Sequence, residues 1–268
     1  MERLQTMKLN FLFHNGKRKA LTFSYDDGVI YDKQLIAIFD KYGMKGTFNL
    51  NSGMMGKGRR LPENEIKEVY KNHEIACHGL NHETMPKLSH LSAVEEILED
   101  RKNLERISGK IVRGMAYAYG ARSPETQKII SELGIIYARR AGNLGGFGIP
   151  DSFMEWHTTC HHNHDLLAKG NTFLGLKNKL ALMFVWGHSY EFNDQNNWGL
   201  IEEFCAKMAN KEDIWYATNI EICEYLLATK AIVTSADCHI IHNPTALTLW
   251  GEWDDEPFKI APGETLQK

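Results

Sequence analysis

The stretch Ala20-Leu21-Thr22-Phe23-Ser24-Tyr25-Asp26-Asp27-Gly28 carries the strongest signal for fold and chemistry in this sequence. Its apolar first half predicts a buried strand, and Gly28 lets the backbone turn sharply after that strand. Two adjacent carboxylates, Asp26 and Asp27, are costly at the end of a buried strand unless a metal or a proton separates them. The stretch therefore predicts a strand that ends in a chemically active loop.

A second motif follows about fifty residues later, in His78-Gly-Leu-Asn-His82. Residues four apart point the same way on a helical turn, and the strand-like segment at 74–77 would bury His78 at its end. Borderline divalent metals such as zinc bind imidazole nitrogen together with carboxylate oxygen. The two motifs together predict a metal site made by Asp27, His78 and His82. A spare carboxylate beside that site is typical of a metal-assisted hydrolase.

The composition limits the classes of protein that the chain can represent. Its 268 residues are enough for one large domain or a domain with a small appendage, and the formal net charge of -3 does not favour a nucleic-acid partner. The sequence contains no apolar run of 18 or more residues, so no membrane helix is expected. Residues 1–7 lack the apolar core of a signal peptide, and the five scattered cysteines form no Cys-x-x-Cys pair. We therefore expect reduced thiols, a cytoplasmic location and no membrane partner.

Strand and helix patterns alternate over most of the sequence. Apolar runs predict strands at 19–25, 46–50, 73–77, 112–118, 135–139, 153–158, 181–187 and 213–218. Capping residues and terminal glycines predict helices at 31–43, 92–108 and 123–133. This alternation is typical of a parallel sheet, open or closed, and chemical residues at strand ends favour a (β/α) barrel. We expect the barrel in residues 1–228 and a small β-rich extension, marked by turn residues, in residues 229–268.

The Asp-Asp-Gly motif after a Thr-Phe strand, followed by the His-x-x-x-His pair, resembles the polysaccharide deacetylases of carbohydrate esterase family four, which share the NodB homology domain. The resemblance covers roughly residues 18–228. It implies a distorted (β/α) barrel of about seven strands and an enzyme that removes N- or O-linked acetyl groups from a carbohydrate. It also implies that Asp26 is the general base and that Asp27, His78 and His82 bind a divalent metal. We expect zinc, with cobalt or nickel as alternatives.

Two later segments correspond in part to further motifs of the family. Tyr119-Gly120 keeps the end of the third motif, and the resemblance implies that the Tyr119 backbone N–H stabilises the oxyanion. Ala116 occupies the position of the family's arginine, so Arg113 or Arg122 would have to hold Asp26. His188 follows a buried strand at the place of the last motif and would be the general acid, for which a histidine pKa near neutrality is suited.

Aromatic and histidine side chains complete the predicted site. Sugar rings stack on aromatic faces, so Tyr117, Trp156 and Trp186 are predicted to bind substrate, although aromatic residues also commonly fill cores. The segment 157–164 contains four histidines, at 157, 161, 162 and 164. Such a cluster can bind a second metal, but it shows no standard ligand spacing. We interpret these histidines as groups at the rim of the site.

Two other functions are compatible with the sequence. One is a cyclic-amide hydrolase of the same superfamily, acting on allantoin-like substrates, which the missing third-motif arginine favours. The intact set of Asp27, His78 and His82 argues against it. The other is a non-catalytic carbohydrate-binding barrel, and the presence of both Asp26 and His188 argues against that function. The sugar and the oligomeric state do not follow from the sequence.

Overall fold

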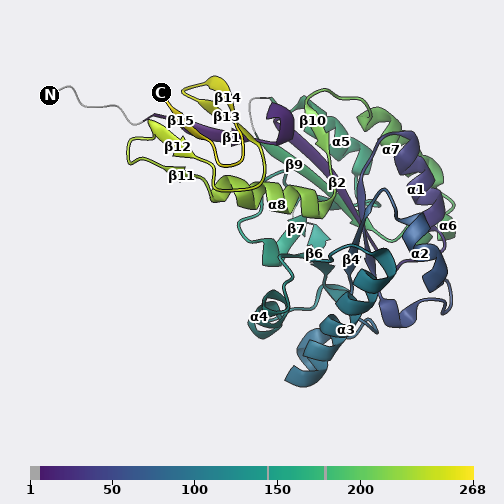
Figure 1. Ribbon diagram of the computed structural model, residues 1–268. Helices are drawn as coiled ribbons and strands as arrows, with labels where there is room; N and C mark the ends of the chain where they lie inside the picture. The colour runs from purple at the N-terminus through teal and green to yellow at the C-terminus, as the bar shows by residue number, and fades with distance from the viewer. Residues whose placement is uncertain (1–6, 144, 178–179) are drawn as a thin grey trace.

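A mainly parallel sheet forms the centre of the molecule (Figure 1). The computed structural model describes residues 7–143, 145–177 and 180–268. The sheet contains β2 (Lys19–Asp26), β3 (Gly46–Leu50), β4 (Glu74–Cys77), β5 (Gly114–Ala116), β6 (Tyr137–Asn143), β7 (Trp156–Thr158), β8 (Cys160–His161), β9 (Ala181–Gly187) and β10 (Ile214–Tyr216). Their order is β7-β6-β5-β4-β3-β2-β9-β8, and β10 pairs with the beginning of β2. Strand β2 is buried along its whole length, as its apolar sequence predicts.

The sheet closes into a barrel because β7 and β8 are two parts of one chain segment. β7 pairs with β6 and β8 pairs with β9, and only Thr159 separates them. The Thr159 backbone N–H donates to the carbonyl of Phe184 in β9, at 2.8 Å. When β7 and β8 are counted as one position, the ring has seven positions and β10 lies outside it. This arrangement confirms the distorted (β/α) barrel of about seven strands that was expected from the sequence.

Helices pack around the barrel and follow most of its strands (Figure 1). The α-helices are α1 (Asp32–Lys41), α2 (Glu63–Val69), α3 (His90–Ser108), α4 (Pro124–Glu132), α5 (Leu166–Gly175), α6 (Ser189–Asp194), α7 (Trp198–Met208) and α8 (Asn219–Lys230). Short 3₁₀ helices are η1 (His14–Gly16), η2 (Ser52–Met54), η3 (Met85–Lys87), η4 (Ala118–Gly120) and η5 (Phe153–Glu155). Helix α3 starts two residues before the predicted position because Ser89, rather than Ser92, is the N-cap. It ends at Gly109 in the left-handed conformation, as predicted.

A β appendage lies at one end of the barrel, beside α8 (Figure 1). Strands β13 (Leu249–Trp253) and β14 (Glu256–Ile260) form one antiparallel sheet with β1 (Leu9–Leu12). Strands β11 (Val233–Thr234), β12 (Ile240–His242) and β15 (Thr265–Gln267) form another. The appendage was expected, but the contribution of β1 from the other end of the chain was not. The division into domains at residue 228 stays a prediction.

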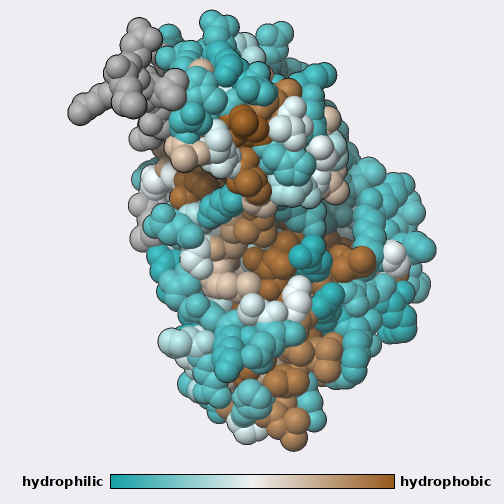
Figure 2. Space-filling view, turned by 60° about the vertical axis from the view of Figure 1, so that its left-hand side comes forward, coloured by the Kyte–Doolittle hydropathy of each residue, from teal (hydrophilic) through white to brown (hydrophobic). Residues whose placement is uncertain are grey.

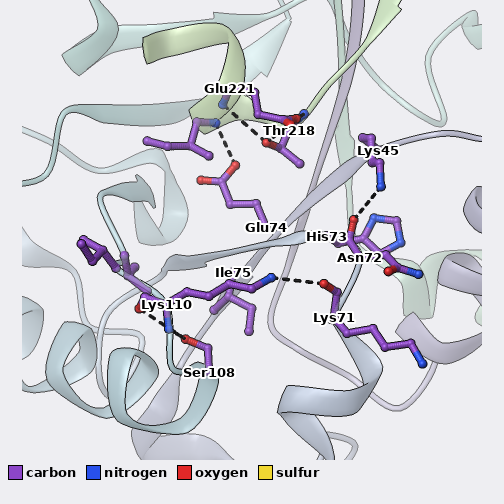
Figure 3. A pocket seen from close by; sticks show the side chains of 13 residues that line it. Lys45, Lys71, Asn72, His73, Glu74, Ile75, Ser108, Lys110, Thr218 and Glu221 are labelled. Carbon is purple, nitrogen blue, oxygen red and sulfur yellow. Dashed lines mark hydrogen bonds between the residues drawn. The ribbon is translucent and has the colours of Figure 1, made fainter. Parts of the chain in front are cut away.

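One face of the molecule carries hydrophobic side chains that gather in patches (Figure 2). A cavity of about 420 Å³ lies near the amino end of β4. Figure 3 shows its lining side chains, among them Lys45, Lys71 and Lys110. In that cavity burial raises the pKa of Glu74 to about 7, against hydrogen bonds from Tyr137 and other donors. No helix of the described residues is long and apolar enough to cross a membrane.

Candidate active site and metal centre

A cavity of about 330 Å³ lies at the carboxyl ends of the barrel strands. Parallel strands bring their carboxyl ends to one edge, so residues far apart in the sequence meet there. Its lining residues are Asp26, Asp27, His78, His82, Tyr117, Tyr119, Gly120, Ala141, Trp186, His188 and Tyr190. Every predicted site residue except Trp156 is in this set. The structure therefore brings together the two motifs that the sequence singled out.

Asp27, His78 and His82 form a compact group of potential metal ligands. Their ligand atoms all lie within 4.8 Å of one another, and the two histidine Nε2 atoms are 3.2 Å apart. The His78 Nδ1 lies 2.8 Å from the carbonyl oxygen of Ala116. Because a carbonyl only accepts, this contact places the proton on Nδ1 and leaves the Nε2 lone pair for a metal. Burial also lowers the pKa of His78, which favours the neutral form that binds a metal.

The loop after β4 positions the two histidines. Residues 78–82 are not helical, so the helical turn that the His-x-x-x-His spacing suggested is wrong. The Asp100 carboxylate accepts from the His78 backbone N–H at 3.1 Å, and the Asn51 side chain donates to the His78 carbonyl at 2.8 Å. The backbone is in the left-handed conformation at His82, with φ of 62°, and at Asp27, with φ of 81°. These two conformations help to turn both side chains toward His78. Such conformations are costly for these residues and concentrate at functional sites.

A buried ion pair holds Asp26 at the base of the cavity. The side chains of Asp26 and Arg139 are 4% and 1% exposed, and the guanidinium contacts both carboxylate oxygens, one at 2.6 Å. The Asn49 side chain also donates to Asp26, at 2.8 Å. Burial by itself raises the pKa of Asp26, but the charge and hydrogen bond of Arg139, together with the nearby imidazoles of His78 and His188, outweigh this effect and lower the pKa to about 2. Asp26 is therefore ionised at neutral pH.

Arg139 corrects the prediction that Arg113 or Arg122 holds Asp26. Those arginines pair elsewhere, with Glu224 at 3.1 Å and with Glu155 at 3.2 Å. Arg139 in β6 is the register partner of Ala116 in β5, the position where the resemblance led us to expect the arginine. The guanidinium that pairs with Asp26 therefore comes from β6, the strand next to the one where it was expected. The available sequence signal was the pair Arg139-Arg140, which directly follows the apolar run 135–138.

Breaking this ion pair is expected to destabilise the fold. Arg139→Met should lower the free energy of unfolding by about 3–5 kcal/mol, because it leaves a buried carboxylate without its partner. The Asp26→Asn, Arg139→Met double variant, which buries no charge, should recover part of that loss. Urea denaturation of the variants measures both effects. Arg113→Met removes an exposed pair and should change the stability by about 1 kcal/mol or less. A double variant no more stable than Arg139→Met would contradict the assignment.

His188 lies between two carboxylates. Its Nε2 is 3.9 Å from Asp26 Oδ2, and its Nδ1 is 3.4 Å from Glu191 Oε1 in α6. Burial lowers the pKa of His188, but the two carboxylates outweigh burial and raise the pKa above its ordinary value. Sequence reasoning missed Glu191, although its position three residues after His188, at the start of a helix, gave a local signal.

The predicted aromatic wall is only partly present. Tyr119 is 70% exposed, with its ring 4.5 Å from the ring of His82, and Trp186 lies over the Arg139 guanidinium at 4.8 Å. Tyr117 lines the cavity but is almost fully buried, with its hydroxyl donating to the Met154 carbonyl. Trp156 does not line the cavity: it is 1% exposed and packs against three aromatic side chains of the core, Tyr137, Phe153 and Phe184. Its prediction as a cavity wall is corrected, because its side chain points into the apolar core.

Comparison with known proteins finds a family that resembles the segment containing most of these residues. Residues 14–138, which contain Asp26, Asp27, His78, His82 and Tyr119, match the model of the polysaccharide deacetylases. The first part of the barrel, residues 14–138, is thus similar to the polysaccharide deacetylases. This match confirms the resemblance, and the class of enzyme that it implies, which were expected from the sequence. A comparison with curated protein sequences gives no match.

Solved structures share the fold of this barrel at low sequence identity. A protein from Mycobacterium smegmatis assigned to the polysaccharide deacetylases matches with 17% identity and a TM-score of 0.64, over 84% of this chain and 96% of its own. The carbohydrate esterase domain of a multidomain xylanase from the hindgut metagenome of Trinervitermes trinervoides matches with 17% identity and a TM-score of 0.55, over 79% of this chain and 92% of its own. A pseudoenzyme of carbohydrate esterase family four from Bacillus anthracis matches with 16% identity and a TM-score of 0.51, over 78% of this chain and 66% of its own.

Proposed function

We propose that this polysaccharide deacetylase is a metal-dependent hydrolase that removes N- or O-linked acetyl groups from a carbohydrate. The observation that carries the proposal is the meeting, in one cavity, of a two-histidine, one-carboxylate donor set with a second carboxylate and a further histidine. Asp27, His78 and His82 would hold a divalent metal, for which zinc is expected. When bound, the metal would supply Lewis acidity and lower the pKa of a water molecule toward ~7.

Asp26 is proposed to remove the proton from the attacking water. It is adjacent to the ligand Asp27 and lines the same cavity. Its ion pair with Arg139 keeps it ionised and fixes its direction, and Asn49 occupies one of its oxygens. The same ion pair makes Asp26 a weak base, so proton transfer needs an acidified water molecule.

His188 is proposed to give a proton to the departing nitrogen or oxygen of the sugar. The raised pKa of His188 favours the protonated form that an acid requires. Glu191 lies near Nδ1 on one side of the ring, and Nε2 faces Asp26 on the other. Glu191 is thus a positioning residue for His188. Tyr119, which also lines the cavity, is proposed to donate its backbone N–H to the developing oxyanion.

Two rival functions make different predictions. The cyclic-amide hydrolase was favoured by the absent third-motif arginine, and the presence of Arg139 beside Asp26 removes that argument. The non-catalytic barrel has a precedent in the Bacillus anthracis pseudoenzyme, whose fold this chain shares. Against it, Asp26 and His188 both lie in the cavity with the metal donor set.

An acetate-release assay separates the three functions. The zinc-loaded protein is incubated with N-acetylated chitooligosaccharides, O-acetylated xylan and allantoin. We expect acetate from at least one carbohydrate, its loss after treatment with a chelator, and its return when zinc is added. Ring opening of allantoin without acetate release would favour the cyclic-amide hydrolase. Carbohydrate binding without acetate release by the zinc-loaded protein would favour the non-catalytic barrel.

A further inference from the structure

The carboxylate of Glu191 contacts three histidines. One of them is His188, whose Nδ1 side faces Glu191 and whose Nε2 side faces Asp26. His161 Nε2 lies 3.0 Å from Glu191 Oε2, and His162 Nε2 lies 3.1 Å from the same oxygen. His188 Nδ1 lies 3.4 Å from Glu191 Oε1. His161 and His162 belong to the histidine-rich segment 157–164, which the proposed reaction does not use. The barrel fold thus joins this segment to the start of α6.

One of these imidazoles contains a buried nitrogen without a hydrogen bond. His162 is 0% exposed, and its Nδ1 lacks a hydrogen-bond partner while its Nε2 faces Glu191. An unsatisfied buried polar atom costs about 1–3 kcal/mol. His162 cannot turn away to find water, because its ring stacks on Phe192 at 4.0 Å and packs against Gly187, where a Cβ would lie 2.1 Å from Nδ1. The His162 ring is therefore held in place against Glu191.

We propose that His161, His188 and Glu191 bind a second divalent cation of the borderline class that includes zinc. Their ligand atoms lie within 4.8 Å of one another, as they do in the first donor set, and the ligand types are again two imidazoles and one carboxylate. His161 is nearly buried, and the side chains of His188 and Glu191 are each 21% exposed, so the group lies between the core and the cavity. His162 lies against the same carboxylate and limits its movement.

The second cation would act on the first site through His188. The Nδ1 atom of His188 would bind the cation while the Nε2 atom of the same ring still faces Asp26. This consequence rests on the proposed function: if His188 is the general acid, a cation on Nδ1 keeps the ring from carrying two protons. Zinc above the amount that fills the first site is then expected to inhibit acetate release.

Counting bound zinc tests the site without reference to turnover. After equilibrium dialysis against micromolar zinc, elemental analysis should find about two ions per wild-type chain. His82→Ala and His161→Gln should each retain about one ion, and the double variant almost none. Glutamine at 161 keeps an amide donor for Glu191. His164→Gln, at an exposed position of the same segment, should retain two.

Cobalt titration of the wild-type protein gives a second readout that needs no variant. Visible absorption is expected to rise in two successive steps, one for each site that cobalt fills. The His161→Gln variant should show only one of these steps. A single ion per wild-type chain, or two ions in a folded His161→Gln variant, would overturn the proposal. Two bound ions without acetate release would contradict the proposed function and leave the second site standing.

Discussion

Asp26→Asn is expected to lower the turnover number for acetate release by about 10²- to 10⁴-fold, the usual contribution of a general base. Asparagine keeps the size of the side chain but cannot accept the proton of the attacking water. Asp26 is not one of the three predicted metal ligands, so the zinc content should stay at the wild-type level. Steady-state kinetics and elemental analysis of the same preparation measure both quantities.

The control for this variant is Asp194→Asn. Asp194 is exposed and pairs with Arg59 at 2.9 Å, away from the residues that line the cavity, so turnover should not change. Loss of zinc from Asp26→Asn would show that Asp26 is a ligand instead of a base. Turnover within a few-fold of the wild type would mean that another group removes the proton.

His82→Ala is expected to abolish acetate release because it removes one of three protein ligands from the metal. The remaining pair, Asp27 and His78, should bind zinc too weakly to hold it through dialysis, so metal content at the first site and activity fall together. His82 lies on a loop with its side chain 18% exposed, so the fold should tolerate the change. Circular dichroism checks folding, and zinc analysis with the acetate assay checks function.

His90→Ala is the matched control for His82→Ala. His90 is 66% exposed at the start of α3 and pairs only loosely with Glu125, at 3.5 Å. It should keep wild-type zinc content and turnover. A His82→Ala protein that retains full activity would remove His82 from the metal site and with it the basis of the proposed mechanism.

Local sequence pattern was a reliable guide wherever one segment contains its own signal. The apolar run before Asp26 became β2, and the run before His188 became β9 with the predicted bounds 181–187. The helix ends at Gly109 and Ser123 were also predicted, because capping depends on a few neighbouring residues. Parallel strands then placed the motifs at one end of the barrel without further information.

Long-range partners were beyond the reach of that pattern. The arginine that pairs with Asp26 is Arg139 in β6, whereas the resemblance led us to expect it at position 116 in the neighbouring strand β5. Strand register, rather than distance in the sequence, decides which side chains meet. Trp156 and Tyr117 have the composition of a binding wall, but burial in the core decides their contacts. The pairing of β1 with β13 joins the two ends of the chain, which no local signal records.

The sequence by itself determined the strand ends, the carboxylate pair and the histidine pair, because each depends on neighbouring residues and on the side alternation of a strand. Only the tertiary structure decided which charge stabilises Asp26, which carboxylate faces His188, and which histidines gather around Glu191. Those choices follow from barrel closure, which brings β6, β8 and α6 to the same end of the barrel. Electrostatic effects act over a few ångströms in space, so they become visible only when the chain is folded.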